Sequence, residues 1–303
     1  MNPSVSVIVP TRDRRELLLR ALGSIFDQRY DGDVEVVVVF DQEAVRDIAI
    51  EDRPGRRVRA ISNDRTPGLA GARNSGILAS KGELVAFCDD DDEWHPDKLR
   101  REVETLVAEP AVEVVVTGTM ICYEDHRIAR VPPEPYVTFQ RLLRSRVQEV
   151  HPSSILVWRE PLLDGIGLAD EEIPGSYGED RDWLLRAARR TPIAVVRAPL
   201  VNAYWHRTSF FAGRWSSMID AIHYLLAKYP EFHTEPSGLA LLYGRLAFAH
   251  AALKHRSEAR RWAWRAIRSD PRERRAYLAI AMSFGLVSAD TLMRMAHRRG
   301  RGI

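Results

Sequence analysis

Four consecutive aspartates follow directly on a strand-like apolar run in this chain. Two carboxylates about 4 Å apart repel by roughly 4 kcal/mol at an effective dielectric of about 20, so four at the end of a buried strand need compensation. In an extended chain, alternate side chains face the same way, which would place Asp89 and Asp91 together and turn Asp90 away. Such a pair suits Mg²⁺ or Mn²⁺, which takes its remaining oxygens from water and substrate phosphates. The alternative is a solvated acidic turn in which Asp92 helps to start the next helix.

A second group of acids lies in the segment "GEDRDW", residues 178–183. If this segment is helical, each residue advances by about 100°, so Asp180 and Asp182 diverge by roughly 200° and only one of them faces a given cleft. The alternative is that these acids simply favour a helix N-terminus electrostatically.

Strand and helix patterns alternate around the first aspartate group. Nearly continuous apolar strands that alternate with helices predict an α/β fold, in which a mostly parallel sheet is covered on both faces. Such sheets bind ligands at the carboxyl ends of their strands, where the aspartates lie. The expected strands span residues 5–10, 34–40, 57–62, 83–88 and 112–120, and the expected helices span residues 14–28, 68–80 and 96–109.

The rest of the chain divides into an irregular middle and a helical end. The middle contains an expected strand at residues 153–158 and further strands at "IAVVRA" and "LVNAYWH". From about residue 215 the pattern is entirely helical and resembles a single tetratricopeptide-type hairpin, although helices packed against the sheet domain are the simpler interpretation. We therefore divide the chain into an α/β domain at residues 1–212 and a C-terminal helical region at residues 213–303.

Composition excludes several classes of protein. Charged residues make up 28% of the chain and nearly cancel at net +2, which argues against a nucleic-acid binder. Two cysteines without paired spacing argue against a disulfide scaffold and favour a reducing cytoplasm. There is no signal-peptide pattern and no apolar run of about 18 residues. We expect a cytoplasmic protein, soluble or peripheral at the inner face of the membrane.

The carboxyl end "TLMRMAHRRGRGI" mixes leucine and methionine with arginines. A solvated basic terminus is one interpretation, and contact with an anionic membrane surface is the other.

Six segments with chemical character follow one another along the chain: "VSVIVPTRDR", "VVVVFD", "PGLAGARNSGI", "VAFCDDDDEWHPDKL", "GEDRDWLLRAARR" and "YWHR". This ordered set strongly resembles the family-2 glycosyltransferases, over about residues 4–210. The resemblance implies a GT-A nucleotide-sugar-binding fold and sugar transfer with inversion at the anomeric carbon.

The resemblance also implies roles for single positions. In the family, the loop after the first strand lines the nucleotide pocket, an acid that ends the second strand contacts the base, and the second acid of an Asp-x-Asp motif is the more direct metal ligand. "FDQE" departs from the usual two acids followed by Gly-Ser, which leaves the base open, with uridine favoured. Arg73 has the alternative of an ordinary helix-surface arginine. The match assigns nucleotide-sugar binding to Pro10, Thr11, Arg12, Asp41, Arg73, Asn74, Asp89 and Asp90, and metal binding to Asp91, Asp89 and His206.

The same resemblance selects one acid from "GEDRDW". The family places its catalytic base at the Asp after Glu, which is Asp180 here. His206 follows a strand-like segment where relatives often carry a histidine near the metal or diphosphate, and a packed core histidine is the alternative. We interpret His151 and His95 as structural or acceptor-side residues.

Taken together, the resemblance implies metal-dependent transfer of a sugar from a nucleoside diphosphate sugar, with UDP-sugar favoured, to an unknown acceptor hydroxyl. The cofactor would be Mg²⁺ or Mn²⁺, and the setting would be synthesis of cell-surface polysaccharide, glycolipid or another glycoconjugate. A nucleotidyltransferase is one alternative, but "PTRDRREL" lacks the Gly of a phosphate loop. A catalytically silent sugar-nucleotide-binding or scaffold protein is another, against which the acids at positions 89, 91 and 180 argue.

Overall fold

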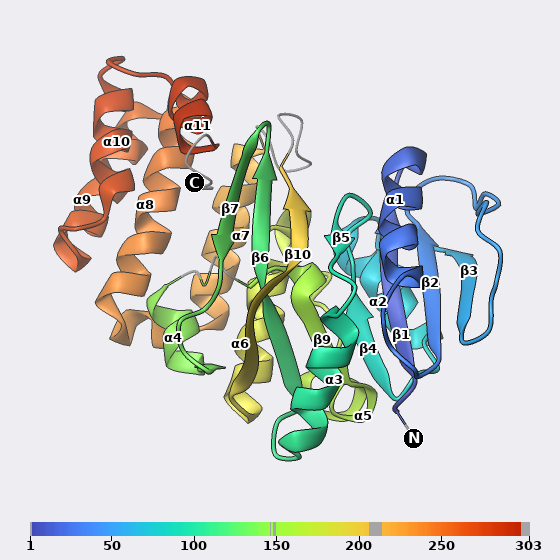
Figure 1. The fold of residues 1–303 in the computed structure, drawn as a ribbon. Coiled ribbons are helices and arrows are strands. Elements are labelled where there is room, and N and C mark those ends of the chain that lie inside the picture. Colours follow the sequence, from blue (N-terminus) through green and yellow to red (C-terminus); the bar gives the residue numbers. More distant parts are fainter. Residues whose placement is uncertain (1, 146, 148–149, 206–213, 298–303) are drawn as a thin grey trace.

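A ten-stranded sheet forms the centre of the described part of the molecule (Figure 1). The computed structural model describes residues 2–145, 147, 150–205 and 214–297. The strand order is β3-β2-β1-β4-β9-β6-β10-β5, with β7 paired to β6 and β8 paired to β10. The strands are β1 (Val5–Thr11), β2 (Val34–Phe40), β3 (Arg56–Ser62), β4 (Leu84–Phe87), β5 (Glu93–Trp94), β6 (Val114–Tyr123), β7 (His126–Arg130), β8 (Tyr136–Val137), β9 (Ile155–Trp158) and β10 (Ile193–Tyr204).

Most of the main strands run parallel, as the apolar runs predicted. β1 is parallel to β2 and β4, β2 is parallel to β3, and β6 is parallel to β10. β9 lies between β4 and β6 and is antiparallel to both. The two strands expected at "IAVVRA" and "LVNAYWH" form the single strand β10, whose register against β6 shifts around Pro199. Proline has no backbone N–H to donate, which explains the irregularity at that point.

Helices cover both faces of the sheet, which confirms the expected α/β architecture. In β2, Val36 and Val38 pack in one cluster with α1 and α3, and Val37 and Val39 pack in a second cluster with α2 and α6. Successive side chains of a strand point to opposite faces, so the apolar run of β2 serves both layers. The helices of this part are α1 (Arg15–Phe26), α2 (Leu69–Ala79), α3 (Lys98–Ala108), α4 (Phe139–Arg144), α5 (Arg159–Pro161) and α6 (Glu179–Arg190).

The C-terminal helices pack directly on the sheet domain. The cluster that contains Val37 and α6 continues through Tyr229, Phe232 and Phe248. The division at residues 212 and 213 stays a prediction. No helix among the described residues combines the length and apolar composition needed to cross a membrane. The C-terminal helices are α7 (Trp215–Lys228), α8 (Pro236–Ala252), α9 (Arg256–Ser269), α10 (Arg274–Ser283) and α11 (Ala289–His297).

The contact between α8 and α4 can be tested with two identical substitutions. A Cβ atom at Gly238 would lie 1.8 Å from the carbonyl oxygen of Leu143, whereas a Cβ at Gly23 in α1 would meet nothing within 4 Å. We expect Gly238→Ala to lower the free energy of unfolding by about 1–3 kcal/mol, because the added methyl group overpacks this contact. Gly23→Ala should raise it by up to about 1 kcal/mol through helix propensity. Urea unfolding measures both, and an unchanged Gly238→Ala protein would contradict the packing.

Candidate active site

The aspartates after β4 form a tight turn rather than an extended strand end. The backbone N–H of Asp92 donates to the carbonyl of Asp89 at 3.1 Å. The chain therefore reverses, and the alternation expected from an extended chain is wrong. Asp90 and Asp91 both reach Arg14, whereas Asp89 and Asp92 lie near His151.

Arg14 holds the middle of this turn. Its Nη1 lies 3.2 Å from Oδ1 of Asp90 and 2.8 Å from Oδ2 of Asp91, and the hydroxyl of Thr11 donates to Asp90 at 2.8 Å. Burial, and then the three neighbouring aspartates, raise the pKa of Asp91 to about 7. The sequence reasoning missed Arg14 and named Arg12, which is exposed. "TRDRREL" offers three arginines after one strand, and nothing local shows which of them turns toward the acids.

Arg73 connects the aspartate turn with the first turn of α6. This nearly fully buried guanidinium donates to Asp89 at 2.7 Å and pairs with Glu179. The surface-arginine alternative is therefore wrong for this residue. Burial raises the pKa of the Glu179 carboxyl to about 7, because the positive charge of Arg73 opposes this rise only in part. Burial alone would raise the pKa of the Asp89 carboxyl, but the charges of Arg73 and His151 outweigh burial and lower that pKa.

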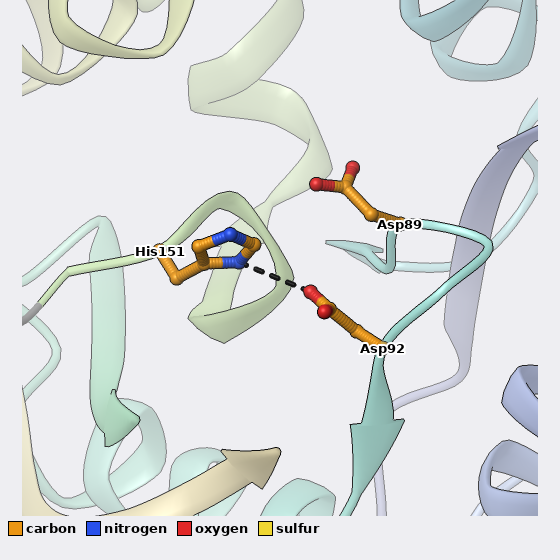
Figure 2. A group of neighbouring side chains, drawn as sticks. All are labelled: Asp89, Asp92 and His151. Carbon is orange, nitrogen blue, oxygen red and sulfur yellow. Dashed lines mark ion pairs between the residues drawn. The ribbon is translucent and has the colours of Figure 1, made fainter. Parts of the chain in front are cut away.

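His151 closes the other side of the turn (Figure 2). Its Nδ1 lies 3.1 Å from Oδ2 of Asp92, and the Ser153 hydroxyl donates to the same oxygen at 2.5 Å. Burial lowers the pKa of His151, but Asp92 and Asp89 raise it overall to about 9. The sequence analysis interpreted His151 as a structural or acceptor-side residue, whereas the structure places it beside Asp92 and Asp89.

The donor atoms around the turn fit a hard divalent cation. One ligand atom each from Asp89, Asp92 and His151 lie within 4.8 Å of one another. Ligands that share one ion at about 2.1 Å lie within roughly 4.2 Å of one another, so the group needs only a small adjustment. The carboxylates suit Mg²⁺ or Mn²⁺, whereas His151 could bind an ion only after losing the proton that Asp92 and Asp89 stabilise. His206, the third predicted ligand, lies outside the described residues.

Of the three acids of α6, Glu179 and Asp180 line one hollow and Asp182 faces away from it. Asp180 lines a hollow of about 320 Å³ together with Arg73, Phe87, Pro152 and Trp183. It forms no hydrogen bond or ion pair within the part of the chain that the structure describes. The structure thus turns Asp180 toward the cleft beside Asp89 and Arg73, whereas Asp182 faces away from it.

Asp182 is fully buried against the C-terminal helices. Its carboxylate accepts from the Tyr229 hydroxyl at 2.7 Å and from Arg186 Nε at 3.0 Å, and Lys228 Nζ lies 2.7 Å away. Lys228 and the Tyr224 hydroxyl also bind Asp170, which lies in the loop before α6. This network fixes the first turn of α6 from behind.

Two of the residues predicted to bind the nucleotide, Asp41 and Asn74, form hydrogen bonds with loop residues in this structure. Asp41 accepts from the Asn63 amide at 2.8 Å and from the backbone N–H of Gly68 at 3.1 Å. Asn74 is buried, and its amide binds the backbone of Ala169 in both directions. Pro10 and Thr11 end β1 beside these loops. A second hollow of about 370 Å³ opens there, lined by Thr11, Asp13, Arg14, Arg15, Leu18, Leu19, Phe40, Glu43, Arg46, Asp47 and Ile48.

A mostly parallel sheet with an acidic turn at the end of β4, facing an acid on α6, is the arrangement of a GT-A fold. Residues 6–164 match the family described as "Glycosyl transferase family 2", and the chain belongs to that family. It is 35% identical over 152 residues to the succinoglycan biosynthesis protein ExoO of Rhizobium meliloti, which covers 48% of this chain and 43% of that protein. It is 33% identical over 103 residues to the putative colanic acid biosynthesis glycosyl transferase WcaA of Escherichia coli, covering 32% and 36%.

The matched regions span less than half the length of these relatives. Among solved structures, residues 1–349 of S. aureus TarS in complex with UDP-GlcNAc align with a TM-score of 0.63 at 18% identity, covering 98% of this chain and 92% of that one. Mannosyltransferase PcManGT from Pyrobaculum calidifontis, in complex with GDP-Man and Mn²⁺, aligns at 0.56 and 20%, covering 99% and 80%. At these identities the likeness shows the GT-A fold.

The buried network around Asp182 predicts a large effect on stability. Asp182→Ala leaves Lys228 and Arg186 without their shared carboxylate, and breaking such a buried pair costs about 3–5 kcal/mol. Asp220→Ala is the matched control, because Asp220 is exposed on α7 and should change stability by less than about 0.5 kcal/mol. Chemical denaturation followed by circular dichroism measures both. Equal stability of the two variants would show that the network contributes nothing.

Proposed function

We propose that this glycosyltransferase transfers a sugar from a nucleoside diphosphate sugar to an acceptor hydroxyl, with a divalent cation and with inversion at the anomeric carbon. The observation that carries the proposal is the link Asp89–Arg73–Glu179, which brings the aspartate turn beside Asp180. The proposed diphosphate site and the proposed proton acceptor would thus lie at one cleft. The names of the relatives, in succinoglycan and colanic acid biosynthesis, support a role in cell-surface polysaccharide, glycolipid or other glycoconjugate synthesis.

The donor would lie across the carboxyl ends of β1, β2 and β4. Pro10, Thr11 and the exposed Arg12 line the first of these ends. Asp41 and Asn74 would act by holding the loops around Gly68 and Ala169 against the nucleotide. Uridine stays the favoured base, supported by the UDP-GlcNAc complex of TarS, while GDP-Man in PcManGT shows that another base occurs on this fold. A cytoplasmic location stays a prediction.

Asp89 and Asp91 would hold the cation, as the family resemblance implies, whereas the ligand atoms that the structure brings together are those of Asp89, Asp92 and His151. The ion, when bound, neutralises charge on the departing diphosphate. Arg14 would release Asp91 to this role and remain paired with Asp90, since it contacts both carboxylates now. Arg73 keeps Asp89 ionised, because its charge lowers the pKa of that carboxyl.

Asp180 would act as the general base. It would accept the proton of the acceptor hydroxyl while that oxygen attacks the anomeric carbon from the face opposite the diphosphate. Glu179 would keep Arg73 in place, and Asp182 would hold the helix. A panel of nucleotide sugars, tested for metal-dependent thermal stabilisation, identifies the donor for the experiments below.

The metal assignment predicts a sharp difference between neighbouring aspartates. Asp91→Ala should abolish Mn²⁺-dependent binding of a nucleoside diphosphate, because it removes the proposed ligand of the ion. Isothermal titration calorimetry with UDP, with and without Mn²⁺, measures this. His151→Gln is the comparison: if it abolishes the metal dependence while Asp91→Ala retains it, then Asp89, Asp92 and His151 hold the ion and the assignment to Asp91 is wrong.

The base assignment predicts a loss of rate without a loss of binding. Asp180→Asn preserves size but removes the proton acceptor, so transfer should fall by roughly 10²–10⁴-fold. Donor and metal affinity should stay nearly unchanged, because their contacts lie on the aspartate turn. The measurement is the rate of nucleoside diphosphate release, with water or a sugar as acceptor, after donor affinity has been determined for each variant.

Two neighbouring variants serve as controls for Asp180→Asn. Asp182→Asn should retain far more activity, because its side chain faces Tyr229 and not the cleft. Glu179→Gln should fall between the two, since it weakens the contact with Arg73. Near-normal transfer in Asp180→Asn would show that Asp180 is not the base. Collapse of transfer in an Asp182→Asn protein that circular dichroism shows to be folded would then place the base two residues further along.

A further inference from the structure

The solvent face of α9 carries a tryptophan among arginines. Trp264 is 61% exposed, while the opposite side of the same helix is buried through small alanines. Residues three and four apart are neighbours on a helix surface, which places Arg260 and Arg261 one turn before Trp264 and Arg268 one turn after it. Arg265 follows Trp264 directly. The exposed indole thus lies on a helix face rich in arginine, where Arg261 and Arg265 stack on the neighbouring buried Trp262.

The neighbouring helix α10 continues this surface. Tyr277 and Phe284 lie seven residues apart, which is nearly two helical turns, so they share one face; they are 49% and 63% exposed. The guanidinium of Arg260 lies 5.4 Å from the centroid of the Phe284 ring, which joins the two helices at the surface. Leu286, in the turn after α10, is 79% exposed. The α9–α10 face is defined by Arg260, Arg261, Trp264, Arg265, Arg268, Tyr277, Phe284 and Leu286.

Positive charge is concentrated in this part of the molecule. Residues 256–297 contain nine arginines and four carboxylates, whereas the whole chain is nearly balanced at net +2. Within the described ranges, only Arg261 and Arg275 of these nine form an ion pair with a carboxylate. Figure 1 shows α9 and α10 at the outer edge of the molecule, with α8 between them and the sheet domain. Arg260, Arg265 and Arg268 of this face thus have no carboxylate partner among the described residues, and their charges can meet an anionic surface.

We propose that the α9–α10 face docks on an anionic lipid membrane. Aromatic rings and exposed leucine insert at the level of the headgroups, while arginines bind anionic headgroups and extend their apolar stems along the surface. A second copy of the chain fits less well, because a two-fold contact would bring the same arginines together. The face lies wholly within described residues and does not depend on residues 298–303 of the basic tail, which lie outside them. The proposal is also independent of the proposed catalytic roles.

Vesicle co-sedimentation tests the proposal with the full chain. Wild-type protein should sediment with vesicles of phosphatidylcholine and phosphatidylglycerol, but not with vesicles of phosphatidylcholine alone, and high salt should release it. The double variant Trp264→Ser/Arg268→Glu should bind at least about tenfold more weakly, because it removes one inserted ring and reverses one charge.

The matched control is Leu78→Ser/Arg57→Glu, which makes the same kind of change at exposed residues on α2 and β3. It should bind like wild type. Equal binding of both double variants, or no wild-type binding to anionic vesicles at low salt, overturns the proposal. Sedimentation equilibrium without lipid tests self-association. If the wild-type protein is a dimer, if Trp264→Ser/Arg268→Glu is a monomer, and if neither binds vesicles, the face is a self-association surface and the proposal is wrong.

Discussion

The constraint on which this site depends is the balance between carboxylates and arginines at the end of β4. Asp89–Asp92 and Glu179 place more negative charge in a partly buried volume than water alone compensates there. Arg14 serves Asp90 and Asp91, and Arg73 serves Asp89 and Glu179, so each guanidinium is shared between two acids. The two guanidinium groups therefore compensate only part of the negative charge of these carboxylates. Burial and the neighbouring aspartates leave the pKa of Asp91 near 7 and that of Glu179 also at about 7. Protons therefore compensate part of the negative charge near neutral pH, and the cation that we propose for this turn would compensate it instead.

The same balance determines the position of α6. Arg73 belongs to α2, Asp89 follows β4 and Glu179 begins α6, so one buried guanidinium joins three segments that are distant along the chain. On its other side, α6 is held by Asp182 against Lys228 and Tyr229, at the end of α7 and just beyond it. Asp180 lies between these two attachments. A base must be held within hydrogen-bond reach of the proton that it accepts, and for Asp180, the proposed base, the ion pairs on either side would supply that rigidity.

Much of the fold, but only part of the site, could be predicted from the sequence. The strands were predictable because burial on both faces requires continuous apolar runs, and the divergence of Asp180 from Asp182 follows from the helical period alone. The turn at Asp89–Asp92 was not predictable from alternation, because one backbone hydrogen bond between Asp92 and Asp89 reverses the chain. The choice of Arg14 over Arg12, and the approach of His151, depend on tertiary contacts between distant segments. The antiparallel insertion of β9 between β4 and β6 is likewise long-range.

The C-terminal helices differ in composition because they have different neighbours. α8 is buried around much of its circumference, and its Gly238 and Gly244 allow close approach, since it lies between α4 and α7 on one side and α9 and α10 on the other. The buried residues of α9 form one stripe of Ala259, Trp262, Ala263 and Ala266. Polar residues on its outer side are sufficient for contact with water. Arginines are such residues, but Trp264 and the neighbouring Phe284 add apolar surface that contact with water does not favour. Solvation therefore accounts for the arginines of this face and not for its aromatic rings, and an interfacial environment accounts for both.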